Sequence, residues 1–289
     1  MSFCKAVLSI AAFLVFSMLV ALAQGTYTQI DYPGTTVYTQ CWGINTAGKI
    51  SGTYWDASYN SHGFLLSGGA YTTIDYPGAQ NTFLTGINDM GRVVGYTDES
   101  GVYAGFVYNI QTRAFTDINY PGAYGTLPSS INNAGAIAGD FYFYGAPGQG
   151  FVLAGSVYSE VTWPGSTATN VWGISSSGSL VGVAYGKNYS YFSFALVKGQ
   201  YRRVAIPNAP GAAVYGINHA GSAIVGSYGS AGLGFLYQGG VLQTLQFPGV
   251  GETVATGVNG AGEVVGYFQN ADSIRHGFTW TPTAGGETK

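Results

Sequence analysis

The fold is decided by residues 71–106, which read YTTIDYPGAQNTFLTGINDMGRVVGYTDESGVYAGF. Four landmarks follow one another in this stretch: Tyr-Pro-Gly at 76–78, Gly-Ile-Asn at 86–88, an apolar run centred on Gly95, and Gly-Phe at 105–106. Six copies of this order fill the chain from about residue 25 to residue 282, one copy about every 43 residues. A fixed period of this size indicates a repeat architecture.

The second landmark is recognisable in all six copies: Gly43-Ile44-Asn45, Gly86-Ile87-Asn88, Ser130-Ile131-Asn132, Gly173-Ile174-Ser175, Gly216-Ile217-Asn218 and Gly257-Val258-Asn259. The Gly-Phe landmark recurs in the same way, with Ser193 in place of glycine in the fourth copy. The Pro-Gly landmark is distorted only in the fifth copy, where extra residues separate Pro207 from Gly211.

The composition indicates strands instead of helices. The chain has 46 Gly and 23 Tyr among 289 residues, and only 8% of its residues are charged. Runs such as residues 92–96 are short, β-branched or aromatic, and bounded by turn residues, as strands are. Each repeat holds four such runs. Four strands in about 40–45 residues match one blade of a β-propeller.

The two ends of the repeat region complete one another. Residues 277–281 form a Gly-Phe strand that no strand follows, and residues 27–32 form the strand that normally follows Gly-Phe. Pairing of these ends removes two open sheet edges. We therefore predict an all-β fold: a six-bladed β-propeller with four antiparallel strands per blade, closed by pairing of the N- and C-terminal strands, in one domain over residues 24–282. The alternative is an open array of blades.

The first residues have the pattern of a secretory signal. One positive charge at Lys5 precedes an apolar run over residues 6–20, and Ala21-Leu22-Ala23 is a small-residue cleavage site. We expect a signal peptide at 1–23 and a secreted, cell-surface or periplasmic protein, with a disordered tail at 283–289. The apolar run is near the lower length for a membrane span, so an uncleaved anchor is the alternative. Cys41 is then the one cysteine left, and we expect it to be buried.

The charge excludes some partners. The chain has a formal net charge of −3, and without Lys5 it has 9 Lys and Arg against 13 Asp and Glu, which gives −4. Such a surface does not attract nucleic acid or anionic lipid. We expect no nucleic-acid partner, and contact with a membrane only if the N-terminal segment is uncleaved. An extracellular glycan or protein is the expected partner.

The recurring polar residues predict turns. Each Gly-Ile-Asn landmark opens an Asn-x-x-Gly sequence such as Asn88 to Gly91, which is typical of a tight hairpin because the Asn side chain bonds nearby backbone and Gly accepts positive φ. A ring of amides lining the axis is the alternative. The mid-strand glycines predict close backbone approach. Most of the tyrosines are expected to pack between blades.

Motifs for known chemistry are absent from the sequence. There is no P-loop, dinucleotide fingerprint, His-Glu-x-x-His or Gly-x-Ser-x-Gly. His62 and His276 occupy equivalent positions in the first and last repeats, which are neighbours in a closed ring, but two His with no fixed third ligand do not define a metal site. We predict no cofactor and no metal.

The landmarks taken together resemble the HAF family of extracellular repeats, which is named for a His-Ala-Phe motif. The motif's position reads His62-Gly63-Phe64 and His276-Gly277-Phe278 here, and the other copies have lost the His. The resemblance covers nearly the whole chain after residue 24. It implies a secreted repeat protein and brings no established activity and no catalytic residues.

Alternating hairpins point to opposite ends of a propeller, so the loops before each Gly-Phe share one face with the Pro-Gly connectors. These loops vary most between copies, and variable loops on a rigid scaffold commonly carry function. They are rich in aromatic and acidic residues. The predicted binding residues are Trp55, Asp56, Tyr59, Asp98, Tyr103, Asp140, Phe141, Tyr142, Tyr144, Tyr189, Asp272 and Arg275, with Asn60, Glu99, Phe143, Tyr185, Tyr191 and Phe268 beside them.

Three functions fit this face. Exposed aromatics beside carboxylates and amides suit sugar stacking, which predicts a secreted binding module for glycans or cell-surface components. A glycoside hydrolase or lyase is the second hypothesis and requires paired carboxylates; its candidates are Asp56, Asp98, Glu99, Asp140 and Asp272. A structural or adhesive protein without a small ligand is the third, and a lone exposed cysteine would favour it. The sequence favours a binding module over an enzyme.

Overall fold

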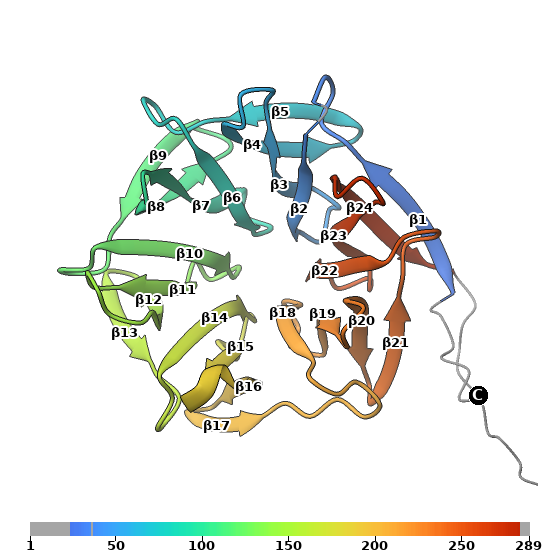
Figure 1. Ribbon diagram of the computed structural model, residues 1–289. Coiled ribbons are helices and arrows are strands. Elements are labelled where there is room, and N and C mark those ends of the chain that lie inside the picture. Colours follow the sequence, from blue (N-terminus) through green and yellow to red (C-terminus); the bar gives the residue numbers. More distant parts are fainter. Residues whose placement is uncertain (1–23, 36, 284–289) are drawn as a thin grey trace, which may run out of the picture.

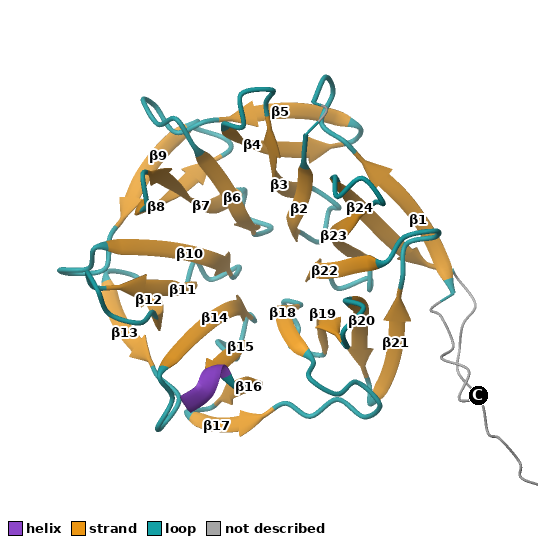
Figure 2. Cartoon of the chain, viewed as in Figure 1, coloured by secondary structure: helices purple, strands orange, loops and turns teal. Residues whose placement is uncertain are grey.

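The protein is a closed ring of six four-stranded antiparallel sheets (Figure 1). The computed structural model describes residues 24–35 and 37–283. The predicted signal peptide at 1–23 and residues 284–289 of the predicted tail lie outside the described residues. Figure 2 shows strands throughout, with one short 3-10 helix, η1 (Lys187–Tyr189), in the described part of the chain.

The blades are numbered in chain order. Blades 1 to 3 consist of β2 (Thr39–Ile44), β3 (Ile50–Trp55), β4 (Ser61–Ser67) and β5 (Ala70–Ile74); β6 (Thr82–Ile87), β7 (Arg92–Glu99), β8 (Val102–Asn109) and β9 (Ala114–Ile118); and β10 (Gly125–Ile131), β11 (Ile137–Tyr142), β12 (Gln149–Ala154) and β13 (Val157–Val161). Blades 4 to 6 consist of β14 (Ala168–Ile174), β15 (Leu180–Tyr185), β16 (Tyr191–Val197) and β17 (Gln200–Arg203); β18 (Ala213–Ile217), β19 (Ala223–Tyr228), β20 (Leu233–Gln238) and β21 (Val241–Leu245); and β22 (Glu252–Val258), β23 (Val264–Gln269), β24 (Arg275–Pro282) and β1 (Gly25–Ile30).

The ring closes by pairing of the chain ends, as predicted. The first described strand, β1, is the outermost strand of blade 6 and pairs antiparallel with β24, from Gly25 opposite Pro282 to Ile30 opposite Gly277. Figure 1 shows these two segments side by side at opposite ends of the colour scale. The closure leaves blade 6 with the same strand order as the other five blades.

Each blade runs from its first strand at the axis to its fourth strand at the rim (Figure 1). Because consecutive strands are antiparallel, the Asn-x-x-Gly turns and the turns before the fourth strands lie on one end, which we name the turn face. The loops between second and third strands and the Pro-Gly connectors lie on the other end, which we name the loop face. This arrangement was predicted from the order of the landmarks.

The core lies between the blades and is built around the Gly-Phe landmarks. The six phenylalanines of these landmarks are fully buried: Phe64, Phe106, Phe151, Phe194, Phe235 and Phe278. Burial of one such side chain stabilises the fold by about 2 kcal/mol. In blade 2, Phe106 lies opposite Gly95, and a Cβ added to Gly95 would lie 2.1 Å from the carbonyl oxygen of Phe83 and 2.9 Å from the Phe106 ring. The mid-strand glycine is therefore required by close approach, as expected.

The Asn side chains form the predicted turns and also join the blades. In blade 2, Oδ1 of Asn88 accepts from the backbone N–H of Met90 and Arg92, at 3.1 and 2.9 Å, and Nδ2 donates to the carbonyl of Asn132 in blade 3 at 2.9 Å. Asn45, Asn132 and Asn259 donate to the next blade in the same way. These four Asn side chains link neighbouring blades around part of the axis.

The chain of amides stops where the sequence departs from the repeat. Ser175 has no amide to donate, and Nδ2 of Asn218 donates to Ser222 of its own turn at 3.2 Å. Blade 4 is linked to blade 5 here by a backbone bond instead, from Ser176 N–H to the His219 carbonyl at 2.9 Å.

A second repeated bond holds the Pro-Gly connectors. A threonine hydroxyl at the start of the first strand accepts from the backbone N–H of the connector's aromatic residue, as in the 3.0 Å bond from Tyr76 to Thr82. The same bond occurs at Thr39, Thr126, Thr169 and Thr253. Blade 5 has Ala212 at this position, which agrees with its distorted connector.

No helical segment in the described part of the chain has the length and apolar character that a membrane span requires.

Candidate functional site: an axial cavity lined by bulge residues

The first strand of every blade carries a β-bulge directly before the Gly-Ile-Asn landmark. In blade 2 the register shifts between Leu84 and Gly86, so that Thr85 has no partner on β7. The same shift leaves one extra residue in each blade; these six residues, which we name the bulge ring, are Trp42, Thr85, Ser129, Trp172, Tyr215 and Thr256. A bulge bends the strand and re-aims a side chain.

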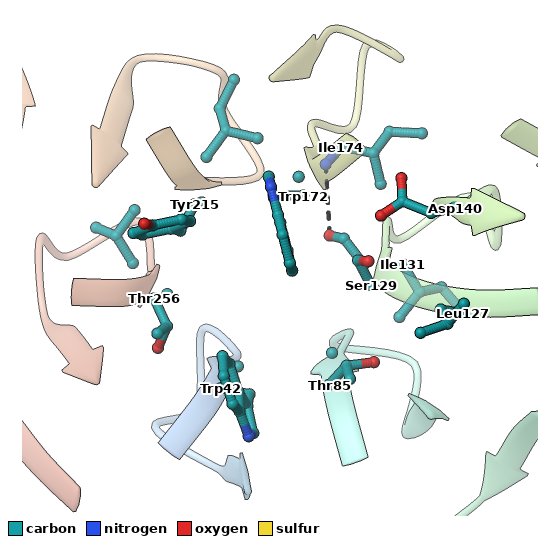
Figure 3. Close-up of a pocket in the computed structure, with 18 of the residues that line it drawn as sticks. Trp42, Thr85, Leu127, Ser129, Ile131, Asp140, Trp172, Ile174, Tyr215 and Thr256 are labelled. Atoms are coloured by element: carbon teal, nitrogen blue, oxygen red, sulfur yellow. Dashed lines mark hydrogen bonds between the residues drawn. The ribbon is translucent and has the colours of Figure 1, made fainter. Parts of the chain in front are cut away.

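The bulge ring faces a cavity on the propeller axis. The cavity has a volume of about 580 Å³, and all six bulge residues line it. Figure 3 shows their side chains arranged around a common opening, with one contributed by each blade. Cavities of this size are typical of small-molecule sites.

Aromatic side chains from opposite blades dominate the ring. Trp42 comes from blade 1 and Trp172 from blade 4, so the two indoles lie on opposite sides of the axis (Figure 3). Trp172 packs edge-on against Tyr215 with 5.9 Å between ring centroids, and Trp42 packs in the same manner against Tyr267 at 6.0 Å. These contacts hold the indoles in place while they line the cavity.

The hydroxyl residues of the ring are fixed by the neighbouring blade. Oγ1 of Thr85 donates to the carbonyl of Pro128 in blade 3 at 2.7 Å, and Oγ1 of Thr256 donates to the carbonyl of Cys41 in blade 1 at 2.8 Å. Their oxygens keep lone pairs that can accept from a ligand. The ring therefore presents apolar faces and hydrogen-bonding atoms to the same space.

Three polar atoms of the lining residues have no hydrogen-bond partner among residues 24–35 and 37–283. Nε1 of Trp42, Nε1 of Trp172 and Nδ1 of His219 are buried and unpaired. A buried donor that stays unpaired costs about 1–3 kcal/mol.

Asp140 contributes a carboxyl group to the cavity wall. It lies in β11, immediately after the mid-strand Gly139, and is 8% exposed. Its Oδ1 accepts from Val171 N–H and its Oδ2 from Nδ2 of Asn170, both at 2.7 Å and both in blade 4. Burial raises the pKa of Asp140 to about 7, although these two hydrogen bonds act in the opposite direction.

The cavity extends along the axis between the two faces. Toward the loop face its lining includes Tyr185 at the end of β15 and Tyr191 at the start of β16, and Tyr191 is 48% exposed. Toward the turn face it includes the buried Ile44, Ile87 and Ile131 of the Gly-Ile-Asn landmarks. A ligand of the cavity therefore meets tyrosines on the loop side.

Two predicted binding residues have a different location from the one expected. Asp140 and Phe141 were expected on an exposed loop, but both lie in strand β11 and are buried. Phe141 is 1% exposed because it stacks on Tyr120 with 3.6 Å between centroids. Phe268 is likewise buried, in a stack on Phe247 at 3.8 Å. Of the predicted binding residues, Asp140 is brought to the cavity.

The predicted acidic residues of the loops are engaged in turns. Oδ1 of Asp56 accepts from the backbone N–H of Ser58 and Asn60, at 2.8 and 2.9 Å, and Oδ1 of Asp98 accepts from Gly101 N–H at 2.8 Å. Asp272 is exposed beside a turn that Asn270 caps. Asp56 and Asp98 therefore have the turn-forming role that is common for Asp in loops.

The predicted aromatic residues form a row on the loop face. Tyr103 lies between Tyr96, which lines the cavity, and Tyr142, which does not. The ring centroid of Tyr103 is 5.6 Å from that of Tyr96 and 5.9 Å from that of Tyr142. Tyr124 continues the row from Tyr142, at 6.0 Å, to Tyr144, which is 84% exposed.

The remaining predicted residues are spread around the loop face. Trp55 packs against the cavity-lining Phe83 at 6.0 Å. Tyr59 is 68% exposed, and the Arg275 guanidinium lies 5.1 Å from the Tyr267 ring centroid. The side chain of Tyr189 lies outside the part of the chain that the structure describes.

The two equivalent histidines are each paired within their own blade. Nδ1 of His62 lies 2.9 Å from Asp75, and Nδ1 of His276 lies 2.7 Å from Asp31. Burial lowers the pKa of His62, but the hydrogen bonds and charges of Asp75 and Asp56 outweigh it and raise the pKa overall. In the described residues no group of three or more His, Cys, Asp or Glu is placed to hold a metal ion.

The bulge ring was missed by reading the sequence, although its position is marked. Each bulge residue directly precedes the Gly-Ile-Asn landmark, or its variant, and is an aromatic or hydroxyl residue in every copy. An aromatic or hydroxyl residue at a fixed position in the strand nearest the axis is the signal that would have indicated it.

No protein-family model and no curated protein sequence matches the chain. Solved β-propeller structures resemble it. A luciferin-regenerating enzyme superposes with a TM-score of 0.57 and 13% identity over 90% of this chain and 96% of that one. TolB from Acinetobacter baumannii gives 0.55 and 12%, over 86% of this chain and 58% of TolB. A mutant of the Aleuria aurantia lectin in complex with α-methyl-L-fucoside gives 0.52 and 12%, over 86% and 97%.

These similarities establish the fold, since sequence identities of 12–13% carry no more than that. The chain spans 58% of the TolB chain, so the whole of that protein is not represented here. The confirmed fold is the six-bladed propeller.

Proposed function

We propose that the protein is a secreted binding module that takes a unit of a saccharide into the axial cavity from the loop face. The observation that carries this proposal is the pair of indoles at Trp42 and Trp172, which opposite blades contribute to the lining of one axial cavity. Secretion is inferred from the pattern of residues 1–23 and from the resemblance to HAF repeats.

The chemistry of the cavity suits a sugar. An indole presents a flat apolar face, and a sugar ring has apolar C–H faces beside its hydroxyl groups. Thr85 and Thr256 add acceptors, and Asp140 adds a carboxyl group that can bind hydroxyls in either protonation state. The fold is compatible with this function, because a lectin in complex with a fucoside shares it.

The two other functions have less support. A glycoside hydrolase commonly uses two carboxyl groups beside the scissile bond. Within residues 24–35 and 37–283, Asp140 is the carboxylate that lines the cavity, and the other candidate acids cap turns or lie at the rim. A structural role would be favoured by an exposed lone cysteine, whereas Cys41 is fully buried.

A glycan-array screen of residues 24–289, with and without calcium, tests the proposal. We expect binding to a related set of sugars, and calorimetric titration of the best one should then show a loss of at least about tenfold in affinity for Trp42→Ala and Trp172→Ala, which corresponds to about 1.4 kcal/mol. Trp55→Ala is the matched control, since Trp55 lies on the loop face outside the cavity lining.

A blank array would contradict the proposal. So would a sugar that binds the Trp42→Ala and Trp172→Ala variants as tightly as the unchanged protein. Loss of binding in the Trp55→Ala variant alone would move the site from the cavity to the loops.

A further inference from the structure

Charge is distributed unevenly around the ring. No Asp or Glu occurs between Glu160 and Glu252, a stretch that includes all of blades 4 and 5. The same stretch holds four basic residues: Lys187, Lys198, Arg202 and Arg203. All of them belong to blade 4 or its loops. A protein with a net charge of −3 thus has one sector that is locally positive.

A small groove lies on the loop face of this sector. It has a volume of about 310 Å³ and is lined by Trp163, Ser166, Ser190, Tyr191, Phe192 and Arg203, among others. Its walls come from the connector before β14 and from the loop between β15 and β16, to which η1 belongs. Oγ of Ser166 donates to the Trp163 carbonyl and Oγ of Ser190 to the Lys187 carbonyl, so both oxygens keep lone pairs for a ligand.

Arg203 is held in the groove without an acidic partner. Its guanidinium carbon lies 3.9 Å from the centroid of the Phe192 ring, a cation–π contact that fixes the plane of the group. In the described part of the chain, the Arg203 side chain forms no ion pair, and its N–H groups donate to no protein acceptor. A guanidinium in this state matches the two oxygens of a carboxylate.

The groove adjoins the axial cavity. Tyr191 lines both, and its hydroxyl donates to the Gly211 carbonyl at 3.1 Å, which anchors the ring between them. A ligand unit in the cavity and a second unit in the groove would therefore lie on either side of one tyrosine.

We infer that the ligand is an acidic saccharide, whose carboxylate binds Arg203 in the groove while a neighbouring unit of the same chain occupies the axial cavity. This inference rests on the proposed function of the cavity. The two locations differ in charge. Asp140 disfavours a ligand carboxylate in the cavity, whereas blades 4 and 5 have no acidic residue that would repel a ligand carboxylate at Arg203.

The test compares a panel of oligouronates with the methyl esters of the same oligosaccharides, in which a methyl group replaces the negative charge. We expect the unchanged protein to bind the acids at least about tenfold more tightly than the esters, and Arg203→Gln to abolish this preference. Arg202→Gln is the matched control, since Arg202 is the adjacent residue and its Nη2 donates to Gln200 instead. It should keep the preference.

The outcomes separate this inference from the function on which it rests. Equal affinity for acids and esters, or a preference that survives in Arg203→Gln, would overturn the acidic ligand alone. Failure of every oligouronate to bind, with neutral sugars bound on the array, would also overturn it alone. No binding of any saccharide, charged or neutral, would overturn both.

Discussion

One bulge residue in each blade determines which side chains line the axial cavity of this propeller. The bulge places one side chain in the cavity without changing the pairing on either side of it, so the identity of that residue is free to vary. Blades 1 and 4 have Trp42 and Trp172 at this position, and blades 2 and 6 have threonines. The closely similar repeats therefore produce a cavity with distinct sides.

Asp140 makes stability depend on pH. Its folded pKa of about 7 is above the usual value near 3.8, so the folded state binds the proton more tightly than the unfolded state. The free energy of unfolding should therefore be greatest below about pH 4 as far as Asp140 is concerned, and this contribution should be lost as pH rises to about 7.

Asp140→Asn should remove this dependence. We expect the variant to be more stable than the unchanged protein at pH 8, by on the order of 3 kcal/mol, and to lose that advantage at pH 4. Urea unfolding at several pH values measures the free energy of unfolding of both proteins. Subtracting one from the other cancels the contributions of His62 and other groups, which titrate in both. A constant difference from pH 4 to pH 8 would contradict the role assigned to this carboxyl.

At the scale of the element, the Asn-x-x-Gly turn has two separable functions. Oδ1 closes the hairpin and Nδ2 joins the next blade, and the repeats include a natural comparison between them. Asn88 does both, whereas Asn218 closes its turn but donates within its own blade. The link between blades is thus an addition to the turn and not a consequence of it.

Asn88→Ala should destabilise the protein more than Asn218→Ala. Both variants lose the turn bonds and the bond donated by Nδ2. Asn88 donates to the buried Asn132 of the next blade, whereas Asn218 donates to the exposed Ser222, where water can replace it. We expect a cost of about 3 kcal/mol for Asn88→Ala and about 2 kcal/mol for Asn218→Ala, measured from urea unfolding curves. Equal costs would show that the bond between blades contributes nothing.

The elements were predictable because each landmark has a local physical cause. The strands follow from β-branched and aromatic runs, and the turns from the chemistry of Asn, Pro and Gly. The bulge could not be predicted in this way, because it depends on Gly95 and its equivalents leaving room for a backbone carbonyl of the facing strand. That contact exists only after the second strand has paired with the first.

The burial of Phe141 and Asp140 was missed for a related reason. A run of five aromatic and acidic residues after Gly139 reads as a loop, but its first three residues continue β11. The stack of Phe141 on Tyr120 involves a connector about twenty residues earlier in the chain, which local sequence does not indicate.

At the scale of the whole molecule, stability depends on closing the ring. Blade 6 is assembled from both ends of the described chain, so opening the pairing of β1 with β24 exposes the edge of β24 and part of the blade 6 core. Thr26 and Thr281 lie directly opposite one another in this pairing, and both are exposed.

A disulfide across the closure should stabilise the ring. We expect the Thr26→Cys and Thr281→Cys double variant to unfold at a higher temperature when oxidised than when reduced, since the crosslink closes nearly the whole chain and a long loop gains up to about 4 kcal/mol. The reduced form of the same variant is the control. Identical melting of both forms would show that unfolding does not begin at the closure.

The cavity itself is a property of the whole ring, because each of its six bulge residues comes from a different blade. The five tryptophans of the chain are well placed to report on it. Trp42 and Trp172 line the cavity, and Trp163 lines the groove beside Arg203. Trp55 packs on the loop face, and Trp280 is fully buried between blades 5 and 6.

The most direct measurement is therefore ¹⁹F NMR of the protein labelled with 5-fluorotryptophan, titrated with the best saccharide from the array. Each resonance is assigned by a Trp→Phe variant. The account predicts that the Trp42 and Trp172 resonances shift together and saturate with one affinity, while those of Trp55 and Trp280 stay unchanged. A saturating shift at Trp55 with none at Trp42 and Trp172 would contradict it and place the ligand on the loops.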